Sequence, residues 1–232
     1  MGLMTFKGGV HPFEGKDLSK DKPIRELLPK GELVYPLSQH IGAPATPIVA
    51  VGDSVLKGQK IAEAGGFVSA PIHASVSGTV KKIEPRRVPT GDMVNSIVIE
   101  SDGEFKEVEY QAVEDVGALS KEEIINRIKE AGVVGMGGAG FPTHVKLSPK
   151  EPEKIDYIIA NCAECEPYLT SDYRIMLDHT EELVEGMRII LSMFEHAKGV
   201  FAVENNKPDC IAKLLELTKD EPRMEVAPLM TK

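Results

Sequence analysis

A glycine-rich stretch is the clearest binding motif in the sequence. Residues 135–143 read GMGGAGFPT, and three of the glycines fit the spacing G-x-G-x-x-G. Glycine lets the backbone approach a ligand closely and turn its N–H groups toward an anion. Pro142 and Thr143 suit the first turn of a helix, whose amino terminus favours anions, and Lys146 follows within a turn. The stretch predicts a loop that holds phosphate or ribityl groups; a flexible loop without a ligand is the alternative.

The context of this loop differs from that of a dinucleotide fingerprint. Such a fingerprint follows a strand and opens a helix, whereas here an amphipathic helical pattern precedes the glycines. The spacing alone therefore does not assign a nucleotide.

A second polar stretch, NCAECEP at residues 161–167, follows an apolar run that predicts a strand over residues 155–161. In open α/β sheets ligands bind at the carboxyl ends of the strands. Asn161, Glu164 and Glu166 are suited to hydrogen-bond a heterocycle and sugar hydroxyls there. The enclosed pair Cys162 and Cys165 has no second C-x-x-C to complete a metal site, so we interpret both as partly buried, inert thiols.

Histidines do not form a metal-binding pattern. His11, His40 and His73 stand singly in the turns GVHP, QHIG and PIHA, without ligand-like spacing. We expect histidines that hydrogen-bond within turns, and no metal site. No Ser–His–Asp or Cys–His arrangement is evident either, so no catalytic side chain is predicted.

The elements that would position the two polar stretches follow an α/β pattern. Ser120 and Glu123 form a capping box, and apolar residues then recur on one helical face, at Ile124, Ile125, Ile128 and Ala131, before Gly132 ends the helix. After the strand at 155–161 we predict a helix over 178–197, a strand over 200–204, a helix over 209–217 and a strand over 224–229. This alternation predicts a parallel sheet.

The part before residue 118 has a different character, with short alternating apolar runs between Gly and Pro turns, typical of an all-β unit. Within it, GDSVLKGQKIA and the return APIHASVSGTV resemble biotinyl and lipoyl carrier domains, or more broadly barrel-sandwich hybrids. Carrier domains present a modifiable lysine between these halves, but no lysine lies between Lys60 and Lys81. We expect the fold without attached biotin or lipoate, and domains at residues 1–118 and 119–232.

Composition excludes several functions. The 232 residues include 27 Lys and Arg against 36 Asp and Glu, a net charge of −9, which argues against nucleic acid as a partner. No uncharged apolar run approaches the roughly 20 residues that cross a bilayer, and the amino terminus lacks a secretory signal. Three cysteines make no disulfide framework. We expect a soluble chain of a reducing compartment without a membrane span of its own.

The two polar stretches together are more specific than either alone. The pattern G-x-G-G-A-G-F-P-T-x-x-K, then an apolar strand, then N-x-x-E-x-E-P, resembles the FMN-binding flavoprotein subunit of respiratory complex I. TFKGGVHP at residues 5–12, QHIGAP at 39–44 and SAPIHASVSGTV at 69–80 resemble the RnfC family of Rnf electron-transport complexes. The resemblance covers essentially the whole chain. It implies a barrel-sandwich-hybrid unit followed by a Rossmann-like FMN-binding domain with a parallel sheet.

This resemblance implies an NAD-linked flavin oxidoreductase subunit in a membrane-associated complex that moves electrons between ferredoxin and NAD and couples them to ion translocation. FMN would be the cofactor and NAD(H) the substrate. The chain would be cytoplasmic, held at the membrane surface by other Rnf subunits. Family positions that cradle the flavin and nucleotide match Gly135, Gly137, Gly138 and Gly140. Lys146 matches a cofactor contact, Asn161 and Glu164 match flavin hydrogen-bonding residues, and Phe141 and Glu166 match positions near NAD(H).

The sequence also departs from the family pattern. Met136 stands where the complex I loop usually has Arg, and Ala163 where it has Asp. These two residues favour the alternative, a non-catalytic docking subunit with a degenerate nucleotide-binding fold. The family continues with more of the flavin pocket, a β-grasp segment and cysteines for two four-iron four-sulfur clusters. We therefore expect a chain truncated at its carboxyl end, inactive by itself, with the clusters in the missing region.

Overall fold

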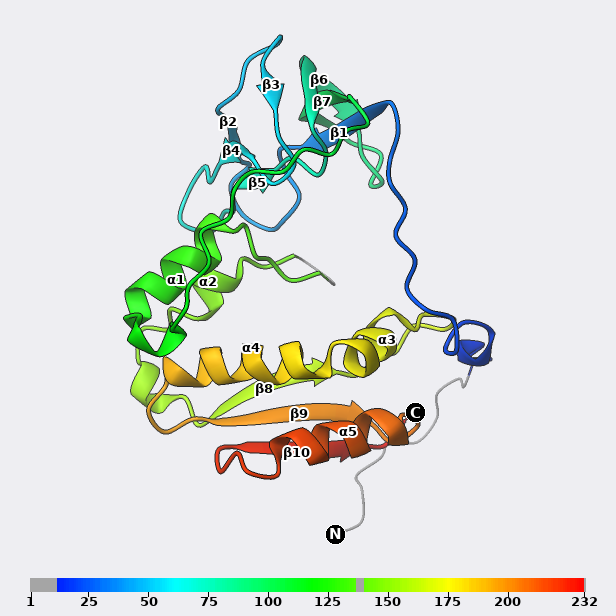
Figure 1. Ribbon diagram of the computed structural model, residues 1–232, viewed down its shortest axis with the longest axis vertical. Coiled ribbons are helices and arrows are strands. Elements are labelled where there is room, and N and C mark those ends of the chain that lie inside the picture. Colours follow the sequence, from blue (N-terminus) through cyan, green and yellow to red (C-terminus); the bar gives the residue numbers. More distant parts are fainter. Residues whose placement is uncertain (1–11, 137–139, 232) are drawn as a thin grey trace. The chain divides into compact units, whose positions relative to one another are not determined.

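A computed structural model describes residues 12–136 and 140–231 (Figure 1). By packing, the chain divides into two compact units, one of residues 27–150 and one that joins residues up to 26 with residues from 151 onward. Each unit is described by itself below. The domain boundary expected at residue 118 stays a prediction.

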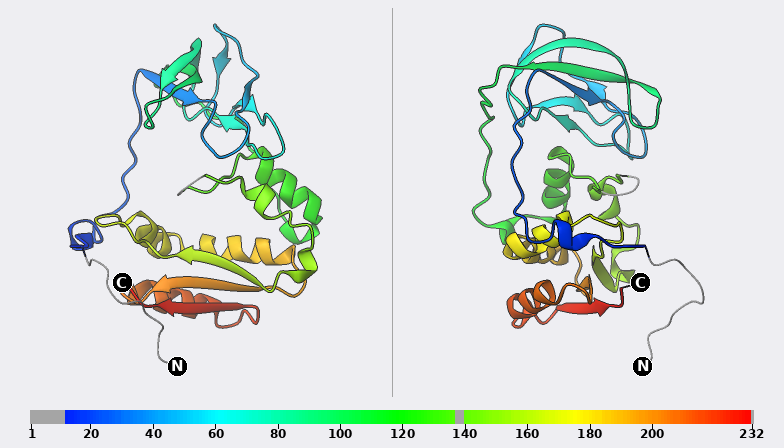
Figure 2. Two further views of the ribbon diagram at one scale, coloured as in Figure 1. Left: turned by 180° about the vertical axis from the view of Figure 1, so that it is seen from behind. Right: turned by 90° about the vertical axis from the view of Figure 1, so that its right-hand side faces the viewer.

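The unit of residues 27–150 contains two antiparallel sheets. The four-stranded sheet has the order β1 (Glu32–Pro36), β7 (Met93–Ser101), β6 (Gly78–Arg87) and β3 (Ser54–Val55). The three-stranded sheet has the order β2 (Thr46–Pro47), β4 (Lys60–Glu63) and β5 (Ile72–His73). A shared apolar core includes Ile61, Val76, Val80, Ile97 and Ile99, all fully buried. Figure 2 shows the strands curling around this core. The predicted barrel-sandwich fold is confirmed.

The same unit carries the helix that precedes the glycine loop. A short 3-10 turn, η2 (Val116–Ala118), leads to α1 (Lys121–Glu130). The predicted capping box is confirmed, because the Ser120 side chain accepts from the Glu123 amide while the Glu123 carboxylate accepts from the Ser120 amide. Of the predicted apolar face Ile124 is buried. Gly132 adopts a left-handed φ of 68°, which ends the helix.

The second unit contains a parallel sheet of order β10 (Met224–Leu229), β9 (Lys198–Glu204) and β8 (Tyr157–Cys162). Helix α4 (Thr180–Ser192) packs on β8 and β9, and α5 (Pro208–Thr218) packs on β9 and β10 (Figure 1). Phe201, Leu191 and Leu214 are buried between the layers. The parallel sheet, its three strands and the helix before β10 are therefore confirmed. Two 3-10 turns, η1 (Lys16–Leu18) and η3 (Pro152–Lys154), complete the unit.

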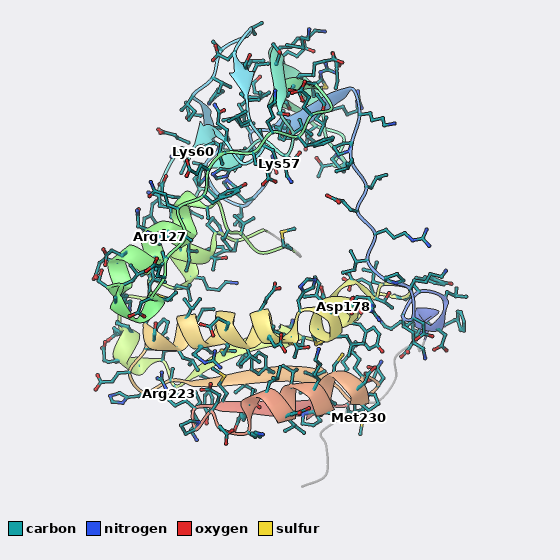
Figure 3. All side chains as sticks on the ribbon, viewed as in Figure 1. Lys57, Lys60, Arg127, Asp178, Arg223 and Met230 are labelled. Atoms are coloured by element: carbon teal, nitrogen blue, oxygen red, sulfur yellow. The ribbon has the colours of Figure 1, made fainter. Side chains whose placement is uncertain are left out.

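The helix expected over residues 178–197 differs from the one observed. It is replaced by two helices, α3 (Ser171–Asp178) and α4, separated at His179, whose φ of −128° is not helical. Helix α4 also ends earlier, at Ser192. Arg223 donates to the carbonyls of Leu191 and Phe194, so the last carbonyls find a side-chain partner instead of another helical turn (Figure 3). None of the helices in the described ranges is long and apolar enough to cross a membrane.

Candidate functional site

The glycine loop is a narrow excursion between two paired residues. Val134 and Pro142 form an antiparallel bridge, and the Gly135 amide donates to the Phe141 carbonyl at 2.9 Å. The loop then enters the short helix α2 (Thr143–Lys146). Gly137 and Gly138 lie outside the described residues. Met136, where the family resemblance predicts a cation, is 98% exposed.

Gly140 rests against the QHIGAP motif of the β unit. Its φ is +59°, and a Cβ added there would lie 3.2 Å from the Gln39 carbonyl oxygen and 3.4 Å from the His40 Cα. His40 in turn accepts a hydrogen bond from the Ala70 amide at 3.1 Å through Nε2. Three motifs that are far apart in the sequence therefore meet in one place: the glycine loop, QHIGAP and SAPIHA.

The turn histidines behave as expected in the part of the chain that the structure describes. His40 Nδ1 lies 3.1 Å from the Ile41 carbonyl, and because Nε2 accepts, Nδ1 is the donor. Burial, followed by the charge of Lys60, lowers the pKa of His73. His11 lies outside the described residues. Across the described ranges no group of three or more His, Cys, Asp or Glu side chains is arranged to hold a metal ion.

The sequence analysis did not single out His144, which lies on α2 directly after the loop. Its ring is buried, and Nδ1 has no hydrogen-bond partner. Burial, then the charge of Lys129, lowers its pKa, so the ring is neutral at pH 7. In the same region Phe141 is half-buried and Lys146 is exposed. This end of the loop therefore presents a lysine to solvent beside a buried neutral imidazole.

Asn161 lies at the carboxyl end of β8, where the sequence places a ligand-binding side chain. It is exposed, and its Oδ1 accepts from the Ala163 amide at 3.2 Å. This contact turns the chain away from the strand into the loop of residues 163–170, which we call the β8 loop. Glu166 is also exposed on that loop.

Glu164, by contrast, is 3% exposed. Its Oε1 accepts from the amide of Asp172 at 2.9 Å, so the carboxylate caps the first turn of α3. Its own amide donates to Glu204 Oε2 at 3.1 Å. Oε2 of Glu164 is buried without a hydrogen-bond partner. The side chain therefore holds the β8 loop against α3 and the end of β9.

Two further charged residues stand at this end of the sheet, and the sequence analysis missed both. Lys207 is buried and donates to Glu204 Oε2 at 2.5 Å. Burial alone would raise the pKa of Glu204, but the Lys207 and Glu164 hydrogen bonds and the charges of Lys207 and Lys16 outweigh it, so the pKa is lowered. A signal was present in the sequence, because Glu204 ends an apolar strand and Lys207 precedes a helix that opens with Pro208.

The cysteine prediction is half right. Cys162 is buried, and burial raises the pKa of its thiol to about 11, so it is inert as expected. Cys165 is exposed, which corrects the expectation of two partly buried thiols. The physical reason is that Cys162 still belongs to β8 and faces the helices, whereas Cys165 lies beyond the strand end.

The predicted binding residues divide between the two units. Gly135, Gly140, Phe141 and Lys146 belong to the unit of residues 27–150; Asn161, Glu164 and Glu166 belong to the other. Within the first unit the loop is built on the β-barrel and α1. Within the second, three polar side chains lie on or beside the β8 loop, where a small pocket of about 70 Å³ is lined by Glu164, Cys165, Pro167, Glu204 and residues of the amino-terminal segment.

Comparison with known proteins agrees with this architecture. Residues 4–104 match the RnfC barrel sandwich hybrid domain, and residues 128–232 match the Nuo51 FMN-binding domain. The RnfC-type subunit of the Na⁺-translocating ferredoxin:NAD⁺ oxidoreductase complex of Acetobacterium woodii is 43% identical over 98% of this chain and 52% of that protein. The corresponding subunit of the proton-translocating ferredoxin:NAD⁺ oxidoreductase complex of Clostridium ljungdahlii is 44% identical over 99% of this chain and 50% of that protein.

A solved structure of an NAD⁺-reducing NiFe-hydrogenase in the H2-reduced state is similar over 50% of this chain and 22% of that chain, with 20% identity and a TM-score of 0.39, too low to carry an argument. The chain spans about half the length of the curated relatives named above. Both halves match families that the sequence motifs indicate. The chain therefore belongs to the RnfC family, with its barrel sandwich hybrid domain in residues 4–104 and an FMN-binding domain of the Nuo51 kind in residues 128–232.

Proposed function

We propose that this chain is the FMN-binding part of an electron-transfer subunit in an Rnf-type ferredoxin:NAD⁺ oxidoreductase complex. The observation that carries the proposal is the match of residues 128–232 to the FMN-binding family. Relatives named as subunits of such complexes support the wider role. NAD(H) is the proposed substrate, and the iron–sulfur clusters belong to a region outside this sequence. The chain would sit at the cytoplasmic face of the membrane through the other subunits.

The residues present fit a flavin nucleotide. Gly140 has a left-handed backbone and no space for a Cβ, which is the property of a loop that keeps its backbone N–H groups close to a ligand. Asn161 is exposed at the carboxyl end of a parallel strand, and Lys146 is exposed after the loop. An amide and a cation are the groups that recognise the ring edge and the phosphate of FMN.

Within this proposal the side chains bind and orient rather than react. Gly135 and Gly140, with Gly137 and Gly138, would offer backbone donors to the ribityl phosphate, and Lys146 would add a positive charge. Asn161 would hydrogen-bond the ring, Glu164 would do so or hold the loop that does, and Phe141 and Glu166 would stand near the nicotinamide nucleotide. When bound, FMN supplies the ability to accept a hydride and to pass electrons on singly. No acid or base from the protein is required for that.

FMN titration tests the proposal directly. The purified chain is added to FMN, and flavin fluorescence and the visible spectrum are recorded. Quenching with a shifted spectrum is expected, and K146A and N161A, one from each unit, should each weaken FMN binding about tenfold or more. K150A, an exposed lysine four residues beyond Lys146, is the matched control and should keep the wild-type affinity. No quenching at high micromolar protein would overturn FMN binding by this chain.

The second candidate function is a docking subunit without a flavin. Met136 favours it, because a fully exposed methionine replaces the cation that the complex I loop carries, and Ala163 removes a carboxylate. The same titration separates the two functions. A docking subunit would leave the flavin spectrum unchanged, and M136R would not restore binding.

A further inference from the structure

The amino-terminal segment of residues 13–22, which we call the strap, packs against the β8 loop although about 150 residues separate them. In Figures 1 and 2 the strap, coloured dark blue, lies beside α3. The Tyr168 amide donates to the Glu14 carbonyl at 2.6 Å. Ser19 Oγ donates to the Tyr168 carbonyl at 3.1 Å and accepts from Thr170 Oγ1 at 2.9 Å. The strap thus contacts the loop along its length.

Lys16 is the centre of this contact. Its ammonium group donates to three carbonyl oxygens of the β8 loop, those of Glu164 at 2.6 Å, Leu169 at 2.9 Å and Glu166 at 3.1 Å. Oε2 of Glu164 lies 3.7 Å away, and the Lys16 side chain is only 13% exposed. A lysine has three N–H donors, and here all three are directed to one loop. This is not the geometry of a solvated surface lysine.

The loop needs such a restraint because it holds a strained residue. Tyr168 has a φ of +67°, a conformation that non-glycine residues rarely adopt and that persists only where the surroundings impose it. Gly15 of the strap, itself at φ +63°, lies so close that a Cβ there would stand 2.4 Å or less from two atoms of the Tyr168 ring. Phe13 packs edge-on against the same ring, with the centroids 6.3 Å apart.

We propose that the strap is a functional part of the flavin domain, and that Lys16 is a positioning residue that sets the conformation of the β8 loop. The flavin part rests on the proposed function. Lys16 acts through backbone carbonyls, so it fixes where Glu164 and Glu166 stand without contacting a ligand itself. Its positive charge, next to the unpaired Oε2 of Glu164, also keeps that carboxylate ionised in a buried place.

The test compares K16M, which keeps the length of the side chain but removes its donors and charge, with K20M. Lys20 is in the same strap, but its side chain is 43% exposed and pairs with Asp17, not with the loop. Hydrogen exchange of the peptide covering residues 163–172 is expected to be at least tenfold faster in K16M than in the wild type and unchanged in K20M. FMN affinity is expected to fall at least tenfold in K16M alone. The visible spectrum of FMN bound at saturation should also shift in K16M and stay as in the wild type in K20M.

The two readouts keep two failures apart. If the wild type binds no FMN, the proposed function fails, and hydrogen exchange alone decides whether Lys16 orders the loop. If the wild type binds FMN and K16M keeps both its affinity and its bound spectrum, the positioning role is overturned. Unchanged exchange in K16M overturns the whole inference. Should K16M not fold, S19A removes only the hydrogen bond to the Tyr168 carbonyl, and faster exchange confined to the loop would support the inference while unchanged exchange would refute it.

Discussion

Single residues at the end of the parallel sheet are governed by buried charge. Glu164, Glu204 and Lys207 are each nearly inaccessible, and Lys16 lies beside them. A buried charge is tolerated only where an opposite charge or hydrogen bonds replace the lost water. Here Glu204 takes donors from both Lys207 and the β8 loop, so the two strands and α5 are tied together by polar contacts. We expect these residues to control the stability of this edge.

The lowered pKa of Glu204 leads to a prediction about acid. Its folded pKa lies below the ordinary 4.5, so the carboxylate contributes stability that is fully present above pH 4.5 and is lost as the pH falls toward the folded value. The wild type should therefore be more stable than E204Q at pH 7. Urea unfolding at several pH values should show that this difference shrinks below pH 4.5, by up to about 1.4 kcal/mol per pH unit.

The matched control for this experiment is E225Q. Glu225 lies on β10 of the same sheet but is exposed, so its substitution should leave the free energy of unfolding within about 0.5 kcal/mol of the wild type. A difference between the wild type and E204Q that does not change with pH would contradict the role given to Glu204.

Cysteine reactivity is a second prediction at this scale. Burial raises the pKa of Cys162 to about 11 and that of Cys210 to about 12, whereas Cys165 is exposed. A maleimide should therefore modify the folded chain at one cysteine and the unfolded chain at all three. Peptide mass spectrometry locates the label, and C165S should abolish the fast reaction. Rapid labelling of Cys210 would show that α5 packs differently.

Among the elements, the glycine loop depends on a backbone conformation that its neighbours impose. Gly140 is left-handed and touches backbone atoms of residues 39 and 40, so a methyl group there has strain and no space. Gly186, in the middle of α4, has nothing within 4 Å of an added Cβ. These two glycines should therefore respond to alanine in opposite ways.

We expect G140A to lower the free energy of unfolding by about 1 to 2 kcal/mol, the cost of a left-handed alanine. G186A should raise it by about 0.5 to 1 kcal/mol, because alanine favours the interior of a helix. Both are measured by chemical denaturation. If FMN binds as proposed, G140A should also weaken its affinity, and G186A should not. A stabilising G140A would mean that the loop does not rest on residues 39 and 40.

Most elements can be predicted from the sequence, because their side chains repeat with a clear period. The predicted strands of the parallel sheet agree with the observed ones within about two residues at their ends, and Ser120 and Glu123 directly indicate the capping box of α1. Helix α3 is the exception. It is eight residues long, and its start is capped by Glu164, a residue seven positions earlier rather than an adjacent one. A cap from outside the local sequence leaves no local signal.

At the scale of the whole molecule, the chain has two separate cores. Ile61 lies in the core of the β unit, and Phe201 lies in that of the α/β unit; both are fully buried. A unit with its own core is expected to unfold as its own cooperative block. The consequences of a core substitution should therefore stay within one unit.

The variants I61A and F201A test this expectation. Each should cost about 2 to 5 kcal/mol, because a large buried side chain leaves a cavity. Native-state hydrogen exchange should show faster exchange in β6 and β7 for I61A, and in β8, β9 and β10 for F201A, with the other unit unchanged. Loss of protection in both units from either variant would show that the two cores unfold together.

By itself the sequence determined the two kinds of fold, the glycine loop and the polar stretch after β8, because periodicity, turn residues and motif spacing are local properties. It also indicated the family, through motifs in both halves. Only the tertiary structure decided that Lys16 restrains the β8 loop, that Glu164 is buried under α3, and that Gly140 meets the QHIGAP motif. Each of these contacts joins residues that lie apart in the sequence, and whether a lysine or a carboxylate is solvated or buried depends on what the folded chain brings to it.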